Sequence, residues 1–366
     1  MRQNEIGISF NKKERVMKDV TTIGIDIAKN FIQIHGANSK GKAVLKKRLA
    51  REKFLPFMAN FPKCLIGMEA CGGAHYWAGE LTKLGFEVKL MSPRKVKMYV
   101  ENNKNDAKDA EACAEAVTRG SMQFVPIKNG TQLEIQAIHR VRSYYVKQRT
   151  GLMNMMRGLL LEIGITIPKG MAPLTKKMMT LLDANNKQLN ESTKNLFTNL
   201  YESLKNLNGE IDRPTSQLEQ LAKEDEYCKR ISTIEGIGPI TATAVIAKIG
   251  NGSEFQKGRE LSAYFGLVPK QHSSGEKTLL LGISKHGDRY VRQLLIHGGR
   301  SSVQAAMKKD KMTGLFVKQD KHSQWLRNLV ERVGKNKASV AAANKNTRMI
   351  VALLKNKSTF QPALAH

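Results

Sequence analysis

The sequence predicts a chain of mixed class, with an α/β domain followed by all-α segments. Short β-like runs alternate with helical runs from residue 21 to about residue 128, which is typical of an α/β domain with a mixed sheet. From about Thr131 the apolar residues instead recur at steps of three and four, which is the spacing of helices.

The α/β domain opens with three β-like runs, TTIGIDI, FIQIHG and KAVLKKRL, separated by KN and by the turn-rich ANSKGK. A three-strand meander is the simplest arrangement for such runs. The remaining pattern predicts, in order, a helix over 51–61, a strand over 64–70, a helix over 74–85, a strand over 86–93 and a helix over 94–102.

Two runs with heptad spacing follow. Their seam positions are Ile138, Val141, Tyr145, Leu152, Met155 and Leu159 in the first run, and Leu200, Leu204, Leu207, Ile211, Leu218 and Leu221 in the second. They predict a coiled-coil region. This region could fold as a helical hairpin or linker packed within one protomer, or it could pair with another chain. Pro214 occupies a seam slot, so we expect it to break or kink the second helix.

The segment from Arg230 onward predicts mainly helices with glycine-rich turns, then two helices over 324–333 and 346–356 and a frayed end. We therefore divide the chain into an N-terminal extension (1–20), an α/β domain (21–128), a helical coiled-coil region (129–228), a compact helical domain (229–320) and C-terminal helices with a tail (321–366).

The charge of the chain indicates a polyanionic partner. Lys and Arg number 60 against 32 Asp and Glu, which gives a formal net charge of +28 over 366 residues. The cations recur throughout, in KKRLAREK, SPRKVKMY, HRVRSYYVKQR, KHGDRYVR and KKDKMTG. Such an excess opposes compaction unless a polyanion neutralises part of it. We expect nucleic acid, bound along a long path with salt-sensitive affinity.

Cysteine usage and hydropathy limit the remaining classes. Cys64, Cys71, Cys113 and Cys228 form no CxxC pair, which disfavours zinc ribbons and disulfide frameworks. The first 20 residues lack the apolar core of a signal peptide, and no run of about 18 apolar residues occurs. We therefore expect a cytoplasmic protein with no membrane span.

Four carboxylates of the α/β domain are candidates for metal binding. Asp26 ends the first strand and Glu69 ends the apolar run CLIGM, where acidic residues are disfavoured. Asp106 and Asp109 lie three residues apart on one face of a predicted helix, although favourable interaction with the helix dipole would also explain them. Together the four acids suit Mg²⁺ and phosphoryl transfer on nucleic acid.

Several further residues are candidates for contact with a phosphate backbone. The turn Gly236 to Gly238 leads into an alanine-rich helix whose N-terminus could face a phosphate, or it could be a plain helix connection. The other candidates are Arg140, Arg142, Lys147, Arg149 and Arg157 in the first heptad run, and Lys270, Lys277, Lys285, His286, Arg289 and Arg292 around QHSSGEK.

The two serines of QHSSGEK have two interpretations. Ser273 or Ser274 could be a nucleophile, because neighbouring cations would stabilise the phosphoryl oxygens. Alternatively, Ser-Ser-Gly is an ordinary turn composition. These residues alone favour neither serine.

Several stretches of the sequence also resemble a known protein family. The stretches TIGIDIAKN, GMEACGG, NKNDAKDAEA, GIGPITA, YFGLVPKQHSSGEK and GISKHGDRYVRQLLIHG resemble, in the same order, the DEDD transposases of insertion-sequence family 110. The resemblance covers roughly residues 21 to 305. It implies an RNase H-like domain related to the RuvC resolvases, a coiled-coil middle and a C-terminal transposase domain.

The resemblance also implies an activity and its residues. It maps a Mg²⁺ site onto Asp26, Glu69, Asp106 and Asp109, and a nucleophile that joins covalently to DNA onto Ser274, the serine before glycine in the P-x-x-x-x-S-G segment from Pro269. It implies a prokaryotic recombinase, associated with the nucleoid when active, that mobilises its own insertion sequence.

The implied partners are donor and target DNA, an element-encoded noncoding guide RNA and further copies of the chain, as a dimer or tetramer. Two other functions remain open from the residues. One is a metal-dependent junction nuclease that uses water as its nucleophile. The other is a non-catalytic nucleic-acid-binding scaffold.

Overall fold

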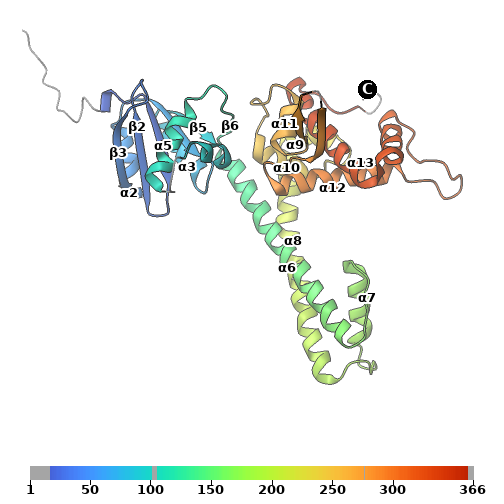
Figure 1. Cartoon of the computed structure of the whole chain (residues 1–366). Helices are drawn as coiled ribbons and strands as arrows, with labels where there is room; N and C mark the ends of the chain where they lie inside the picture. Colours follow the sequence, from blue (N-terminus) through green and yellow to red (C-terminus); the bar gives the residue numbers. More distant parts are fainter. Residues whose placement is uncertain (1–16, 101–104, 276, 362–366) are drawn as a thin grey trace, which may run out of the picture. The chain divides into compact units, whose positions relative to one another are not determined.

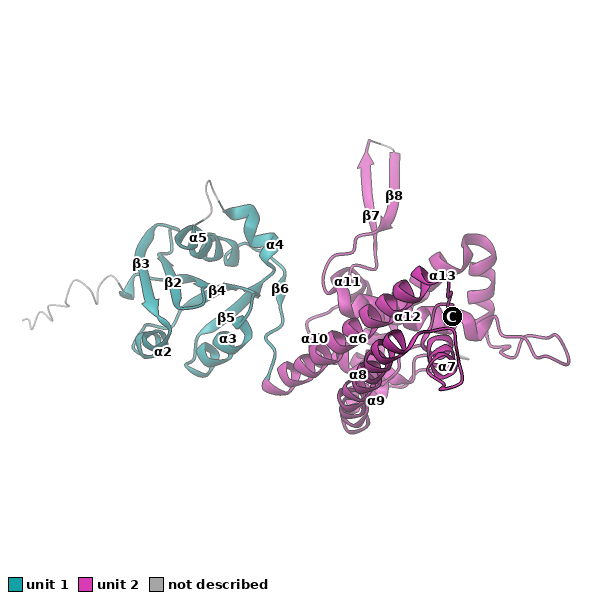
Figure 2. Cartoon of the chain, turned by 90° about the horizontal axis from the view of Figure 1, so that it is seen from below, with its two compact units in different colours: residues 1–129 teal, residues 130–366 magenta. Residues whose placement is uncertain are grey.

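A computed structural model describes residues 17–100, 105–275 and 277–361 of the chain. The chain forms two compact units, residues 1–129 and residues 130–366 (Figure 2). The first carries the sheet with its covering helices, and the second is mainly helical (Figure 1). The mixed α/β start and the helical remainder predicted from the sequence are therefore confirmed.

Unit 1 is built on a six-stranded mixed sheet in the order β3-β2-β1-β4-β5-β6. Its strands are β1 (Thr22–Ile27), β2 (Phe31–Ala37), β3 (Ala43–Ala50), β4 (Leu65–Glu69), β5 (Glu87–Met91) and β6 (Phe124–Val125). The first three pair antiparallel, as the predicted meander requires, whereas β1, β4 and β5 run parallel. The short edge strand β6 was not predicted.

Helices cover both faces of this sheet. They are α2 (Arg51–Ala59), α3 (Ala74–Lys83), α4 (Pro93–Val96), the 3₁₀ turn η1 (Lys97–Tyr99) and α5 (Asp106–Val117). Phe54 of α2 and Trp77 of α3 pack with Ile23 and Ile25 of β1 in one apolar core. The helix predicted over 94–102 is shorter than expected, and its residues 101 and 102 lie outside the described residues.

Helix α5 rests directly on the opposite face of the sheet, at two glycines. Gly24 of β1 and Gly67 of β4 are register partners. A Cβ atom at Gly24 would lie 1.9 Å from the backbone oxygen of Ala110, and one at Gly67 would lie 2.6 Å from that of Cys113. Both distances are shorter than a van der Waals contact, so only glycine lets the α5 backbone come this close.

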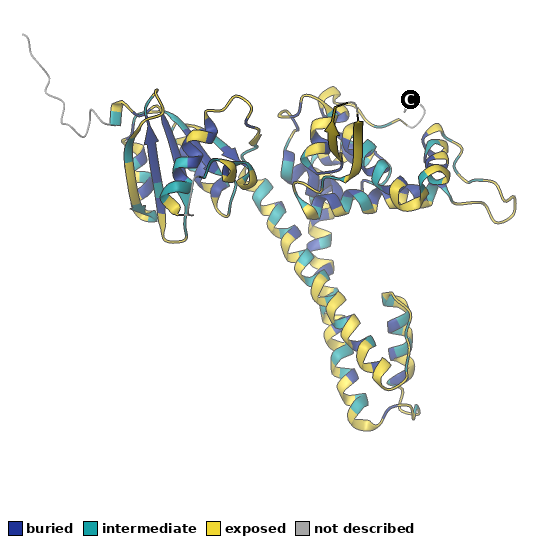
Figure 3. Cartoon of the chain, viewed as in Figure 1, coloured by how far each residue is buried: buried dark blue, intermediate teal, exposed yellow. Residues whose placement is uncertain are grey.

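Unit 2 contains the remaining elements. They are α6 (Gly130–Glu162), α7 (Met171–Leu181), α8 (Glu191–Glu224), α9 (Glu226–Ser232), α10 (Pro239–Ile249), α11 (Gly258–Tyr264), β7 (Pro269–Ser274), β8 (Lys277–Ile283), α12 (Arg289–Ala306) and α13 (Lys321–Asn356). Residue Gly334 interrupts the helical backbone of α13. Among the described residues, the largest buried cluster joins residues of α9, α10, α11, α12 and α13, and the helices of unit 2 show dark blue buried stretches beside exposed yellow ones in Figure 3.

The two heptad runs form α6 and α8, which pack against each other within the chain. Arg142 donates a hydrogen bond to Thr215 at 2.8 Å and Arg149 donates one to Asn208 at 3.2 Å, so the helices run antiparallel. Of the predicted arrangements, the structure therefore has the helical hairpin within one protomer. Supercoiling of the two helices as a coiled coil stays a prediction.

Two details of this hairpin differ from expectation. Met155 and Leu159 of the first seam are exposed, whereas Met156 and Leu160 are buried. The buried stripe is shifted because the end of α6 packs against α7 as well as α8. In addition, α8 continues through Pro214, which is buried, so the expected break is wrong, whereas a kink at Pro214 stays a prediction.

A β-hairpin interrupts the helices where only helices and turns were predicted. Strands β7 and β8 pair antiparallel, with Ser274 opposite Lys277, and the hairpin projects from the helices of unit 2 (Figure 2). Gly275 begins the connection with a φ of +57°, a conformation that favours glycine. All six residues of β7 are exposed, which explains why no inward and outward alternation marked the strand in the sequence.

The remaining sequence expectations concern cysteines and membranes. The four cysteines are free thiols. Among the described residues, no helix has both the length and the apolar character needed to cross a bilayer.

The glycine contact yields a stability prediction. Gly24→Ala should lower the free energy of unfolding by at least about 1–3 kcal/mol, because the new methyl group overlaps the α5 backbone. Gly79→Ala is the matched control, since Gly79 lies inside α3 with open space at its Cβ position. That change should raise stability by about 0.5–1 kcal/mol. Urea unfolding measures both, and equal effects would contradict the close approach of α5.

Candidate functional site

Asp26 and Glu69 lie side by side at the ends of two parallel strands. Ile25 of β1 is the register partner of Met68 of β4, so Asp26 and Glu69 are the next residues on neighbouring strands. Because side chains alternate along a strand, Asp26 shares the face of Gly24 and Glu69 shares the face of Gly67. Both carboxylates therefore belong to the face that α5 covers.

The N-terminus of α5 adds two further carboxylates. Asn105 caps the helix, and its side chain accepts a hydrogen bond from the backbone nitrogen of Ala107 at 2.7 Å. Asp106 and Asp109 occupy the first turn that follows. Carboxylate oxygens of Asp26, Asp106 and Asp109 all lie within 4.8 Å of one another. The structure thus brings together three of the four acids singled out in the sequence.

Glu69 is not part of this group of three, but its charge acts on the same region. Burial and the charges of Glu69 and Asp26 raise the pKa of the Cys113 thiol on α5. Burial, Asp26 and Glu69 likewise raise the pKa of Cys71, just after β4. Glu69 is therefore close enough to add negative potential to the cluster from its β4 side.

The three gathered carboxylates suit a hard divalent cation. Two unit charges 4 Å apart repel by about 1 kcal/mol in water and by about 4 kcal/mol at an effective dielectric constant of 20. A divalent cation would remove that repulsion, and carboxylate oxygens are the donors that Mg²⁺ prefers. The group contains no nitrogen or sulfur donor, which disfavours zinc.

The second candidate, Ser274, belongs to unit 2 and ends strand β7. It shares a face of the strand with His272, whereas Ser273 lies on the other face. There the Ser273 hydroxyl accepts a hydrogen bond from the side chain of Gln271 at 2.8 Å. The two serines therefore have different surroundings, which the sequence alone did not reveal.

The predicted phosphate-contacting cations have different surroundings. Exposed are Arg140, Lys147, Lys270, Lys277, Lys285, His286 and Arg289. Arg142, Arg149 and Arg157 are half-buried and donate hydrogen bonds within the α6–α8 region. Arg292 is buried, and its guanidinium donates to the backbone oxygens of Phe265 and His286. The contact of these residues with nucleic acid stays a prediction.

The glycine turn before α10 is tightly packed at one end. A Cβ atom at Gly236 would lie 2.4 Å from the backbone oxygen of Gly298 on α12, so that glycine permits close packing. Gly238 precedes α10 with open space around it. Only the Gly238 end of the turn thus has room for a ligand at the helix N-terminus.

Comparison with known families matches both parts of the chain. Residues 23–165 match a family described as DEDD transposase of the IS110 type. Residues 228–312 match the family described as "Transposase IS116/IS110/IS902 family". The first match contains the four acids, and the second contains Ser274.

Two similar proteins cover almost the whole chain, and a third covers about a quarter of it. "Transposase for insertion sequence element IS1111A" of Coxiella burnetii is 41% identical over 99% of this chain and 96% of its own length. "Probable family 20 transposase" of Pseudomonas aeruginosa is 41% identical over 94% of this chain and 99% of its own. "Pilin gene-inverting protein" of Moraxella lacunata is 37% identical over 24% of this chain and 27% of its own.

The acidic cluster predicts that Mg²⁺ stabilises the unchanged protein more than it stabilises a variant that lacks one of the three carboxylates. Asp26→Asn removes one carboxylate of the cluster and leaves the first turn of α5 unchanged in sequence. With Mg²⁺ at 100 times its dissociation constant, the unchanged protein should gain about 2.7 kcal/mol, and the variant should gain little.

Thermal unfolding with and without Mg²⁺ measures both stabilities. The electron paramagnetic resonance spectrum of added Mn²⁺ reports bound ions directly. Asp212→Asn is the matched control, because it removes an exposed carboxylate of α8 in unit 2. An equal Mg²⁺ response in Asp26→Asn and Asp212→Asn would contradict a metal site at the cluster.

Proposed function

The chain belongs to the IS116/IS110/IS902 family of transposases, and on that premise we propose that it cuts and rejoins DNA through a metal-dependent acidic site and a covalent serine–DNA bond. Membership of the family makes it an enzyme of DNA strand transfer and recombination that mobilises an insertion sequence. The further steps of the reaction are proposals, supported as follows.

The observation that carries the proposal is the approach of Asp26, Asp106 and Asp109 to within 4.8 Å. The two-glycine contact holds α5 against the sheet, so the carboxylates are positioned before any ligand arrives. We assign Glu69 to the same site, from the neighbouring strand. When bound, Mg²⁺ would supply a Lewis acid that stabilises the charge of the phosphoryl oxygens and the leaving oxygen.

The covalent step is assigned to Ser274. Its Oγ forms a bond to the phosphorus of the scissile phosphodiester, and the bond from that phosphorus to the departing DNA oxygen breaks. The proton of Ser274 passes to a base, for which His272 on the same strand face is the candidate. A proton returned by that base, directly or through water, converts the departing oxygen into a hydroxyl group. Attack by a hydroxyl of another DNA strand then reverses these changes, joins the strands and frees the serine.

The partners proposed are donor and target DNA, a noncoding guide RNA of the element and further copies of the chain. The net charge of +28 supports a large nucleic-acid assembly, because one strand of guide and two DNA duplexes provide many phosphates. A homo-oligomer, dimer or tetramer, would bring several copies of each unit to the DNA.

Ser274→Ala should abolish the covalent adduct while leaving DNA and RNA affinity within about twofold, because the alanine removes only the nucleophile. Ser273→Ala is the matched control: it is the adjacent residue on the opposite face of β7, and it should keep the adduct. Denaturing electrophoresis of protein incubated with labelled cognate DNA and Mg²⁺ detects the adduct. An adduct that persists in Ser274→Ala and disappears in Ser273→Ala would reassign the nucleophile.

The same gel distinguishes the alternatives. Asp26→Asn combined with Glu69→Gln should also lose the adduct, since the metal ligands are removed. DNA cleavage without attached protein would instead favour a nuclease that uses water. The absence of cleavage by the unchanged protein on cognate DNA would favour a binding scaffold.

Guidance by RNA predicts a specific co-purifying molecule. Sequencing of RNA bound to the purified protein should give one abundant structured species encoded beside the gene. Digestion of that RNA should abolish the adduct, and adding the same transcript should restore it, whereas a scrambled transcript of equal length should not. A mixture of cellular RNAs in proportion to their abundance would contradict guidance.

A further inference from the structure

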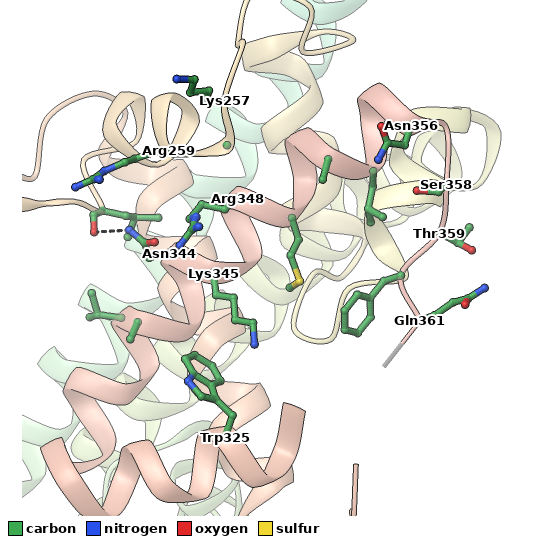
Figure 4. Close-up of a pocket in the computed structure, with 18 of the residues that line it drawn as sticks. Lys257, Arg259, Trp325, Asn344, Lys345, Arg348, Asn356, Ser358, Thr359 and Gln361 are labelled. Carbon is green, nitrogen blue, oxygen red and sulfur yellow. Dashed lines mark hydrogen bonds between the residues drawn. The ribbon is translucent and has the colours of Figure 1, made fainter. Parts of the chain in front are cut away.

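A wide groove in unit 2 lies outside both candidate sites. It has a volume of about 1680 Å³ and is lined by residues of α11, of α13 and of the segment that follows α13 (Figure 4). Small-molecule pockets typically measure about 300–1,000 Å³. The size of the groove therefore favours part of a polymer over a single metabolite.

The walls of the groove carry positive charge without compensating acids. Six of the 21 described lining residues are Lys or Arg, and none is Asp or Glu: Lys257, Arg259, Lys337, Lys345, Arg348 and Lys357. Within the described part of the chain, none of these six forms a salt bridge. Elsewhere in unit 2 a cation such as Lys248 does pair, with Asp288 at 2.6 Å.

Helix α13 arranges three of the cations in a row. Lys337, Lys345 and Arg348 follow Gly334 and are separated by eight and three residues, so they share one face of the helix. At 1.5 Å per residue, the row extends over roughly 16 Å. Successive phosphates of a duplex strand advance by about 3.4 Å along the axis, so the row could follow several phosphates.

The centre of the row is held in place by an aromatic ring. The ammonium of Lys345 lies 4.2 Å from the ring centre of Trp325, and His322 stacks on that ring. Figure 4 shows the Lys345 side chain pointing toward Trp325. Burial and the charge of Arg348 lower the pKa of Lys345. An anion bound between Lys345 and Arg348 would offset both effects, so the two cations form a partly preorganised anion site.

The groove also leads to the strand that carries the serine. Leu267 and Pro269 line its wall, and Pro269 is the first residue of β7. The side chain of Asn344, another lining residue, donates a hydrogen bond to the backbone oxygen of Leu267 at 3.1 Å. This bond ties α13 to the base of the hairpin, and Ser274 follows Pro269 by five residues, or roughly 17 Å along a strand.

We propose that the groove between α11 and α13 binds the sugar-phosphate backbone of a nucleic-acid strand and directs that strand to the base of the β7–β8 hairpin. The groove is thus a binding site separate from the acidic cluster, and its proposed guiding role rests on the function proposed above for Ser274. Lys257 and Arg259 contact the strand from the start of α11, and Lys337, Lys345 and Arg348 contact it from α13. The polar lining residues Asn356, Ser358 and Thr359 offer hydrogen bonds to sugars or bases.

Binding of labelled 30-nucleotide probes to the full chain tests the proposal. Single-stranded RNA, single-stranded DNA and duplex DNA are compared at several salt concentrations. The test variant combines Lys337→Gln, Lys345→Gln and Arg348→Gln. For the strand that occupies the groove, affinity near 0.1 M salt should fall on the order of 30- to 100-fold, and the salt slope should become less steep by about 2.

Two further variants keep the result interpretable. Lys169→Gln, Lys176→Gln and Lys187→Gln together remove the same charge from exposed positions in and around α7, and should lower affinity much less. Lys257→Gln with Arg259→Gln changes only residues at the start of α11, so it should also lower affinity even if the α13 variant is unstable. Urea unfolding of each variant confirms that it is folded.

The probe with the largest groove-specific loss identifies the strand as RNA, single-stranded DNA or duplex. A loss in both groove variants that matches the α7 control for all three probes would overturn the proposal. Ser274→Ala protein should retain the groove-dependent affinity. Failure of the covalent chemistry and failure of the groove therefore give different results.

Discussion

The close approach of α5 to the sheet is the constraint on which the candidate acidic site depends. Gly24 and Gly67 are partners on β1 and β4, and the α5 backbone occupies the space where their side chains would lie. This contact sets the distance between the first turn of α5 and the strand ends. Aspartates on the helix and on the strand are then close enough to share a cation. A small shift of the helix would separate their carboxylates, so the site depends on this contact.

The proposed chemistry is divided between two structural environments. The carboxylates lie on the regular elements of unit 1, which hold them near one another at an electrostatic cost that a cation would offset. Ser274 lies on an exposed two-stranded hairpin of unit 2, whose residues pack little against the helices. A reaction that uses both needs the units, from one chain or two, to meet around DNA.

The positive charge is likewise divided by role. Some cations stabilise the fold: Arg292 donates to two backbone oxygens, and Arg142 and Arg149 join α6 to α8. The groove cations have no salt-bridge partner among the described residues, and burial and the charge of Arg348 lower the pKa of Lys345. The net charge of a sequence cannot separate these groups, because it does not show which cations are already hydrogen-bonded.

The sequence by itself determined most elements of unit 1 and the place of its acids, though not the edge strand β6, because strand alternation and helix spacing are local properties. Asp26 and Glu69 ended predicted strands, and Asp106 and Asp109 began a predicted helix. Only the tertiary structure decided the rest. In α6, packing of α7 shifts the buried stripe towards Met156, and α8 continues through the buried Pro214. The exposed hairpin around Ser274 and the groove along α13 likewise appear only in the tertiary structure. These features depend on which distant surfaces meet, and contacts between distant residues leave no periodic signal in the chain.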